Sequence, residues 1–270
     1  MKVVGFVLGA LIGLIVLVVV GLQIKPRPFD PYGGEGGEVA TMALPAGLPV
    51  PVARFYRTIY GDDVPVITSA VISGRGPLRV NGITFQSRFR FTHQAGQGYR
   101  HYIEATIFGL PLLKVNERYV DGESLFEMPF GTIENDPNTN QGANLALWAE
   151  AVWYPSVWVT DPDVRWEPID DETAVLVVPF GEEEQHLVAR FDPETGRLRL
   201  MSSMRYKGAE SVSKTLWLNE AKAWEAFDGQ MAVSKGAVTW FDEGTPWAIF
   251  DVEEIVLNSD VSDYILAKGE

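Results

Sequence analysis

ITFQSRFRFTH, residues 83–93, is the stretch that decides how the folded part of this chain is built. Its aromatic residues Phe85, Phe89 and Phe91 alternate with polar residues. A period of two sends successive side chains to opposite faces of a β-strand, so we expect a strand with one buried and one solvated face.

Similar short segments continue on both sides of this strand. The turn Gln94–Gly98 leads into a returning strand, Tyr99–Ile107, and Asp121-Gly122 is the strongest hairpin signal in the chain. Gly74-Arg75-Gly76 before Pro77 is interpreted as a turn. Further strands are predicted at 64–73, 118–120, 124–127, 173–180, 186–191, 197–206, 214–219, 223–227, 237–242 and 246–257. Short turns imply antiparallel pairing, which predicts a mainly antiparallel α+β fold with a curved sheet or incomplete barrel.

Two helices are predicted within this fold. A short one spans Val50–Tyr60, entered through prolines. The other spans Gly142–Tyr154, follows the polar loop 134–141 and has Asn140 as its expected N-cap. It is apolar on every side and too short to cross a bilayer, so we expect the sheet to wrap around it.

Glu150 is the only ionisable residue of the predicted buried helix. A buried carboxylate must be paired, hydrogen-bonded or raised in pKa. One interpretation is an ion pair with an inward arginine, Arg88, Arg90 or Arg165. The other places Glu150 at the floor of an apolar pocket, where it orients a ligand or acts as an acid or base. The predicted ligand-binding residues are Glu150, Trp148, Trp153, Phe89, Phe91 and His101.

The chain also resembles a known family. The residues that carry the resemblance are Glu150-Ala151-Val152-Trp153-Tyr154-Pro155, Val164–Asp171 and Leu48–Phe55. They resemble an uncharacterised bacterial domain family of unknown function, usually found behind an N-terminal hydrophobic segment. The resemblance covers most of residues 48–257 and implies one domain, but it transfers no functional residue.

Metal and cofactor sites are not predicted. His93 and His101 lie symmetrically about Gln97 and so are expected to face each other across a hairpin, but no third ligand follows at a fixed spacing. Asp136 opens a segment like the start of a calcium loop, yet that pattern fails at its later ligand positions, and a helix-capping turn explains the same residues. Nucleophile-elbow, phosphate-loop, zinc-protease and dinucleotide motifs are absent from the sequence.

An uncharged run, Val3 to Ile24, is long enough to cross a bilayer as a helix. A cleaved signal peptide is the alternative, but the run is long and lacks a small-residue cleavage pattern. Gly5, Gly9 and Gly13 share one helix face and allow homo-association through that face. We therefore expect a single-pass anchor at residues 1–25, a Pro/Gly-rich linker at 26–47 that holds the domain away from the membrane, one β-rich domain at 48–262 and a tail at 263–270.

Charge and composition restrict the partners. The formal net charge is -14, and such an acidic chain is not expected to bind nucleic acid. The absence of cysteine excludes disulfides and thiolate sites. Positive charge near the apolar run is nearly balanced, but the acidic residues that soon follow it favour an extracytoplasmic domain in the cell membrane.

The predicted function is non-enzymatic: a membrane-tethered domain that binds an apolar or amphiphilic ligand, such as a lipid, in a β-sheet cleft. An envelope scaffold or assembly partner with a filled core is the first alternative. A hydrolase that uses Glu150 is the second.

Overall fold

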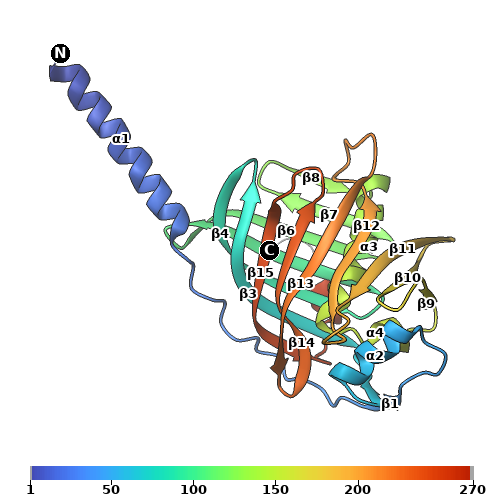
Figure 1. Ribbon diagram of the computed structural model, residues 1–270. Coiled ribbons are helices and arrows are strands. Elements are labelled where there is room, and N and C mark those ends of the chain that lie inside the picture. Colours follow the sequence, from blue (N-terminus) through green and yellow to red (C-terminus); the bar gives the residue numbers. More distant parts are fainter. Residues whose placement is uncertain (1, 268–270) are drawn as a thin grey trace.

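The computed structural model describes residues 2–267 as one N-terminal helix and a domain built on a large antiparallel sheet (Figure 1). The first helix is α1 (Lys2–Gln23), and the sheet has thirteen strands in the order β8-β7-β6-β5-β4-β3-β15-β14-β13-β12-β11-β10-β9. One half comprises β3 (Ser69–Val80), β4 (Ile83–Gln94), β5 (Gly98–Ile107), β6 (Leu110–Val120), β7 (Glu123–Met128) and β8 (Gly131–Glu134). The other comprises β9 (Arg165–Pro168), β10 (Thr173–Phe180), β11 (Glu183–Phe191), β12 (Leu198–Arg205), β13 (Thr215–Phe227), β14 (Gln230–Trp240) and β15 (Pro246–Leu257). The predicted mainly antiparallel α+β fold is confirmed.

Smaller elements border the sheet. They are β1 (Thr41–Ala43) paired with β2 (Asp63–Pro65), the helices α2 (Val50–Ile59), α4 (Val157–Thr160) and α5 (Ser262–Leu266), and the 3-10 turn η1 (Ala151–Trp153). The predicted helix entered through prolines is α2. The hydroxyl of Tyr56 in α2 donates to the carbonyl of Pro155 at 2.7 Å. This bond fixes α2 against the turn that follows the buried helix.

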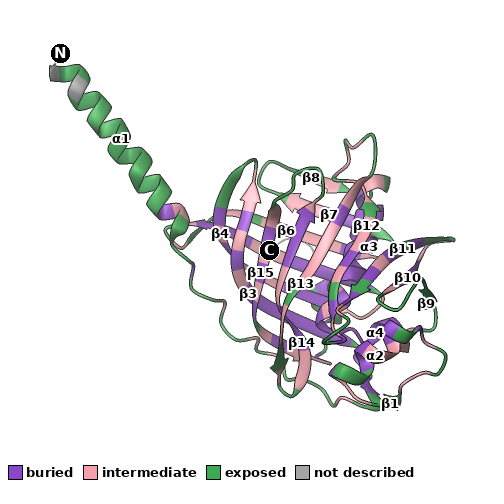
Figure 2. Cartoon of the chain, viewed as in Figure 1, coloured by how far each residue is buried: buried purple, intermediate pink, exposed green. Residues whose placement is uncertain are grey.

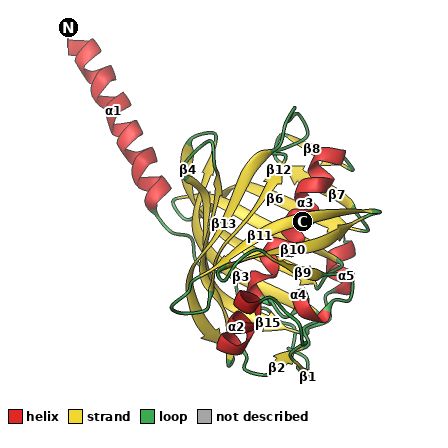
Figure 3. Ribbon diagram, turned by 45° about the vertical axis from the view of Figure 1, so that its right-hand side comes forward, coloured by secondary structure: helices red, strands yellow, loops and turns green. Residues whose placement is uncertain are grey.

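The buried helix is α3 (Pro137–Glu150), and the sheet curls around it (Figure 3). Asn144 near its middle accepts a hydrogen bond from the Tyr119 hydroxyl of β6 at 3.0 Å, and its amide donates to the Pro179 carbonyl of β10 at 2.9 Å. Because β6 and β10 lie toward opposite edges of the sheet, α3 bridges the gap that a closed barrel would fill with strand pairing. An apolar helix is therefore enclosed by an unclosed barrel, and most of its side chains are buried (Figure 2).

The start of α3 differs from the prediction. Residues 137–141 belong to the helix rather than to a loop, and Asp136, not Asn140, is the N-cap. The Asp136 carboxylate accepts from the backbone N–H of Thr139 at 2.9 Å, which satisfies one of the free donors of the first turn. Pro137 at the first helical position needs no backbone donor, so the polar segment can be helical.

Two predictions about the strands are also wrong. Gly74-Arg75-Gly76 is not a turn but lies inside β3, at the seam where β3 pairs with β15. A Cβ added at Gly74 or Gly76 would clash with the backbone carbonyl of Asp251 or Ile249, so these glycines permit close backbone approach. Residues 215–227 form one strand, β13, with register shifts around Ala223, rather than two strands.

The segment between α1 and β1 lies against the sheet, although its composition predicts a linker that holds the domain away from the membrane. The guanidinium of Arg88 on β4 lies 4.3 Å from the ring centroid of Phe29. Arg75 donates to the Pro26 carbonyl at 2.8 Å. These contacts with arginines of the sheet hold the segment between α1 and β1 against the domain, although its proline and glycine content predicts a flexible linker.

The apolar helix α1 leaves the domain at the β4–β5 side of the sheet (Figure 1). By length and composition it can cross a membrane. A Cβ added at Gly9 or Gly13 would meet no described atom within 4 Å, while the surroundings of Gly5, the third residue of the predicted contact face, lie outside the described residues. Residues 268–270 of the predicted tail also lie outside them.

Candidate functional site

Two histidines meet inside the sheet, on the face that carries the phenylalanines. The β4–β5 register pairs His93 with Tyr99 and His101 with Phe91. The histidines are therefore diagonal neighbours rather than directly opposed, because the turn is centred one residue earlier than the predicted symmetry about Gln97. Their ring centroids are 5.2 Å apart, and both side chains are buried.

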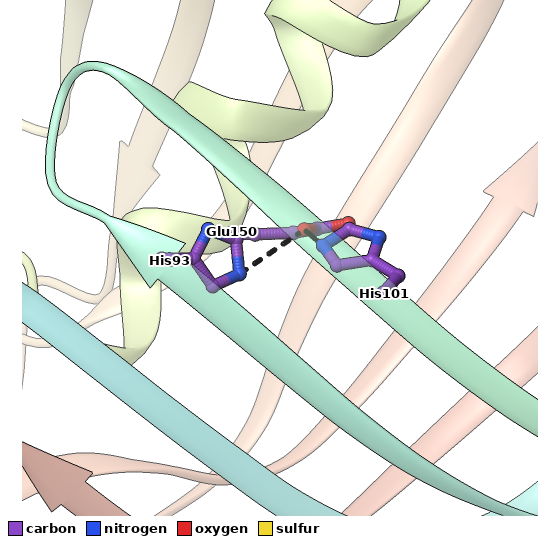
Figure 4. A group of neighbouring side chains, drawn as sticks. All are labelled: His93, His101 and Glu150. Atoms are coloured by element: carbon purple, nitrogen blue, oxygen red, sulfur yellow. Dashed lines mark ion pairs between the residues drawn. The ribbon is translucent and has the colours of Figure 1, made fainter. Parts of the chain in front are cut away.

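Glu150 at the end of α3 reaches these histidines (Figure 4). Its Oε2 atom lies 2.8 Å from His101 Nε2 and 3.6 Å from His93 Nε2. The carboxylate side chain is 18% exposed, so it is mostly removed from water. The predicted burial of Glu150 agrees with this position.

The predicted arginine partners of Glu150 are wrong. Arg88 pairs with Glu104, and Arg165 pairs with Glu167 and Glu184. Arg90, the third candidate, donates to Ser73 and to the backbone of Asp30. All three lie on other surfaces of the sheet. Histidines from β4 and β5 replace them because these strands place their imidazoles on the inner face.

A second carboxylate lies on the opposite side of His101. Glu117 on β6 is in register with His101, and its Oε2 atom lies 3.8 Å from His101 Nδ1. The hydroxyl of Tyr99 donates to the other oxygen of Glu117. The Tyr99 ring is stacked on the His101 ring with centroids 4.0 Å apart. Tyr99 and Glu117 therefore fix the orientation of the His101 imidazole.

Burial and neighbouring charges set the protonation of this group. Burial alone would lower the pKa of His101, but the charges of Glu150 and Glu117 outweigh it and raise that pKa to about 9. Burial lowers the pKa of His93, and the nearby His101 adds to this effect. Burial opposes ionisation of Glu117, but the neighbouring His101 and the hydrogen bond from Tyr99 hold the pKa of that carboxyl below its usual value.

An inward arginine that the sequence analysis missed lies near the cluster. Arg205, at the end of β12, has its guanidinium carbon 4.5 Å from the ring centroid of Trp217 and packs against Gly142 of α3. Its charge helps to lower the pKa of Glu117. No spacing in the sequence links residues 117 and 205, because the sheet brings together strands from its two halves.

A narrow pocket lies beside Glu150, between the end of α3 and strands β12–β15. Its lining includes Glu150, Trp153, Met201, Asn219, Val233 and Phe250. The cavity volume is about 40 Å³, which is room for a few water molecules. The pocket is apolar apart from Glu150, Asn219 and Glu220.

The structure separates the remaining predicted site residues. Trp153 lines the pocket, whereas Phe91 packs between His101 and Trp153, with centroid distances of 4.1 and 5.7 Å. Phe89 contacts Phe91 and Phe250 in the core. Trp148 is fully buried, and its carbonyl accepts from the Trp158 indole at 2.9 Å. Asp136, the candidate calcium ligand, is the N-cap of α3.

Chemically, the cluster offers two imidazoles and one carboxylate at a single point. Such a set can share a proton or bind a metal ion, and the adjacent pocket can accept a small apolar group.

Known structures with a similar chain path have low sequence identity to this chain. A LolA superfamily protein from Nitrosomonas europaea is 14% identical, with a TM-score of 0.48, and the match covers 81% of this chain and 96% of that one. A DUF1329 family protein from Desulfovibrio piger is 12% identical, with a TM-score of 0.46, and the match covers 81% and 94% of the two chains. A comparison with curated proteins gave no match.

A family model matches residues 38–252, which is well over half of the chain. The match includes all three segments that carry the resemblance to an uncharacterised family, at 48–55, 150–155 and 164–171, and confirms that resemblance. The chain therefore belongs to DUF6544, a family of unknown function.

Proposed function

We propose that this protein is a single-pass membrane-tethered domain that binds an apolar or amphiphilic ligand, such as a lipid acyl chain, in the pocket beside Glu150. The observation that carries the proposal is the pocket itself, an apolar space enclosed between a buried helix and the inner face of the sheet. Pockets of this kind, with few polar groups, are typical of ligand sites in partly closed barrels.

The size of the pocket limits the ligand. A cavity of about 40 Å³ is far smaller than the roughly 300–1,000 Å³ of pockets for drug-sized ligands. It suits one slim alkyl group rather than a whole two-chain lipid. Binding of a longer chain requires β12–β15 to move away from α3.

Polar groups at the pocket wall favour an amphiphile over a hydrocarbon. The Asn219 amide nitrogen lines the pocket region and has no hydrogen-bond partner among the described residues. Glu150 supplies an acceptor at the same wall. A hydroxyl on the ligand would satisfy both groups, because it can accept from the Asn219 amide and donate to the Glu150 carboxylate, and an unpaired buried polar atom is costly.

The end of the sheet nearest α1 supports placement at a membrane. In an antiparallel meander every second turn lies at the same end, so the β3–β4, β5–β6, β7–β8 and β14–β15 turns share one end. The Phe108 backbone N–H in the β5–β6 turn donates to the Gly21 carbonyl at the end of α1, at 2.8 Å. These turns expose large apolar side chains, which we call the apolar rim: Ile83, Phe108, Leu110, Phe130 and Phe241.

The apolar rim favours contact with lipid over solvent. Phe130 is 92% exposed and Leu110 is 68% exposed, which is unfavourable in water but favourable at a bilayer interface. With α1 retained as the anchor and the domain on the extracytoplasmic side, the rim would rest on the outer surface of that membrane.

Native mass spectrometry of the full-length protein extracted in detergent tests the proposal. We expect a bound amphiphile, and we expect Ala221→Leu, which fills the pocket from the inner face of β13, to remove it. Ala226→Leu, on an exposed part of β13, is the matched control and should retain the ligand. Recovery of both variants and the parent protein without any ligand, even after incubation with fatty acids, would contradict the proposal.

A scaffold function is the second candidate, and the density of the core favours it. The interior holds several fully buried large aromatics, including Trp148, Trp158 and Trp217. A domain with so filled a core can act through its surface alone. In that case Ala221→Leu would leave every function of the protein intact.

A further inference from the structure

The strongest unexplained feature of the molecule is the group formed by His93, His101 and Glu150. Each contributes one atom, and the three atoms lie within 4.8 Å of one another. They come from β4, β5 and α3, so the group exists only because the helix docks inside the sheet. No sequence spacing produces it.

The separations fit a shared ion. Metal–nitrogen and metal–oxygen bonds of about 2.0–2.2 Å at tetrahedral angles place neighbouring ligand atoms about 3.3–3.5 Å apart. Glu150 Oε2 lies 2.8 Å from His101 Nε2 and 3.6 Å from His93 Nε2, on either side of that spacing. All three atoms lie within 4.8 Å of one another, so a shared ion requires the side chains to rotate until His93 and His101 also reach this spacing.

Unsatisfied polar atoms give a second, independent indication. Neither nitrogen of the fully buried His93 has a hydrogen-bond partner among the described residues. His101 Nε2 and Glu150 Oε2 are close, yet they lack the alignment of a hydrogen bond. Buried polar groups of native proteins are almost always satisfied. A cation bound between these three residues would satisfy His93 Nε2, His101 Nε2 and Glu150 Oε2 together.

The surroundings of His101 resemble those of a metal ligand. Its Nδ1 atom faces Glu117, and Glu117 is itself held by the Tyr99 hydroxyl. A carboxylate behind a metal-binding imidazole fixes the ring and increases the basicity of the coordinating nitrogen. The Nε2 atom is thereby directed at Glu150 and His93.

We propose that His93, His101 and Glu150 bind one divalent transition-metal ion, zinc or a chemically similar ion. Two imidazoles and one carboxylate suit Zn²⁺ better than Mg²⁺ or Ca²⁺, which prefer oxygen ligands. Three protein ligands leave a fourth position for water or for a ligand atom. Because Glu150 also lines the pocket, the ion would lie at the pocket wall. This inference does not depend on which ligand, if any, the pocket takes.

A charged His101 between two carboxylates is the competing explanation for the same geometry. In that arrangement the proton, not a metal, would balance Glu150 and Glu117. It leaves His93 without a role, and it predicts a protein that binds no metal at this position. Metal stoichiometry distinguishes the two explanations.

The test uses the full-length protein in detergent, stripped of metal with a chelator and titrated with Co²⁺. We expect one Co²⁺ per chain, with the intense visible absorption of a four-coordinate ion that disappears when Zn²⁺ displaces it. His93→Gln, His101→Gln and Glu150→Gln should each weaken binding by more than about 100-fold, and Glu117→Gln by about 10- to 100-fold. His186→Gln removes the chain's third histidine, at an exposed position of β11, and should leave binding unchanged.

A measurement on the unmodified protein covers the case in which a variant does not fold. X-ray absorption of the Zn²⁺-loaded chain should show two imidazole ligands and one or two additional oxygen ligands. Absence of stoichiometric Co²⁺ binding, a zinc shell without imidazole, or unchanged affinity in folded His93→Gln would each overturn the proposal.

Discussion

His101 Nε2 lies 2.8 Å from Glu150 Oε2, while His101 Nδ1 faces Glu117 on the opposite side of the ring. One imidazole thus connects the end of the buried helix with the third strand of the β4–β5–β6 meander. Because His101 contacts both Glu150 and Glu117, the docking of α3 depends on the register of β5 and β6. We therefore expect the contact between His101 and Glu150 to contribute measurably to the stability of the protein.

We expect His101→Gln and Glu150→Gln to be coupled in the metal-free protein. Each single change leaves the other partner buried and poorly satisfied, at a cost of about 1–3 kcal/mol in the free energy of unfolding. The double variant should lose less than the sum, with a coupling of about 0.5–3 kcal/mol. Urea unfolding followed by tryptophan fluorescence measures all four proteins.

Glu167→Gln provides the comparison for that cycle. Glu167 pairs with Arg165, and both side chains are about half exposed. Exposed pairs contribute about 0–1 kcal/mol, so this variant should unfold close to the parent protein. Strictly additive effects of His101→Gln and Glu150→Gln would show that the two side chains are energetically independent.

Asp161 gives a prediction about pH. Burial raises the pKa of this carboxyl, although a hydrogen bond from the Asp163 backbone N–H acts in the opposite direction. An acid whose pKa is higher in the folded state reduces stability when it is ionised, and this cost disappears as the pH falls through the folded-state value. Asp161→Asn keeps the acceptor oxygen and removes the charge. It should therefore raise the unfolding midpoint at pH 7 and leave it nearly unchanged at pH 3.

The matched variant for this test is Asp171→Asn, which removes one charge from an exposed loop. If it stabilises the protein as much as Asp161→Asn does at pH 7, relief of the overall negative charge explains the effect. A loss of stability at neutral pH in Asp161→Asn would contradict burial as the source of the shift.

The fold could be predicted because its main signals are local. Alternation of Phe85, Phe89 and Phe91 with polar residues specifies a half-buried strand without any knowledge of its partners. The apolar side chains on every side of the helix predicted at 142–154 likewise require burial on all sides. The errors came where a local signal has two meanings: Gly-Arg-Gly-Pro at 74–77 is typical of a turn, but here it allows two backbones to approach within a seam.

Only part of the site could be predicted, because the rest depends on strand register. The β5–β6 turn at Phe108-Gly109 uses left-handed backbone angles at both residues, and nothing in a bulky Phe suggests such a turn. Even with the turn known, the register shift between Ala105 and Thr106 changes the residue opposite His101 by one position. Without that shift Asn116 rather than Glu117 would face the histidine. A one-residue slip reverses the face of each side chain, so the contact between His101 and Glu117 is hidden from sequence reasoning, whereas the spacing of His93 and His101 already predicted that these two meet.

The β3–β15 seam should be the part of the sheet most sensitive to small substitutions. In Gly76→Ala the new methyl group would clash with the Ile249 carbonyl, which is backbone and cannot rotate away. We expect Gly76→Ala to lower the free energy of unfolding by at least about 1–3 kcal/mol, because the added methyl group forces the backbones of β3 and β15 apart. Gly208→Ala, at a loop position with open space around the added Cβ, should be nearly neutral. Equal stability of the two variants would show that the seam accommodates side chains.

The apolar rim makes a prediction about depth in the membrane. The chain has no cysteine, so a single introduced cysteine is a unique labelling site. The measurement uses Leu110→Cys labelled with an environment-sensitive dye in lipid nanodiscs. Its emission should lie at shorter wavelength than that of the same dye coupled to a small free thiol in detergent-free buffer. The reason is that the β5–β6 turn is bonded to the end of α1, so its side chains would enter the membrane interface. Ile169→Cys, an exposed apolar position in the β9–β10 turn at the opposite end of the sheet, should show aqueous emission. Quenching by brominated lipids should follow the same order. If both labels are equally aqueous, the domain stands clear of the bilayer and the exposed rim must serve another partner.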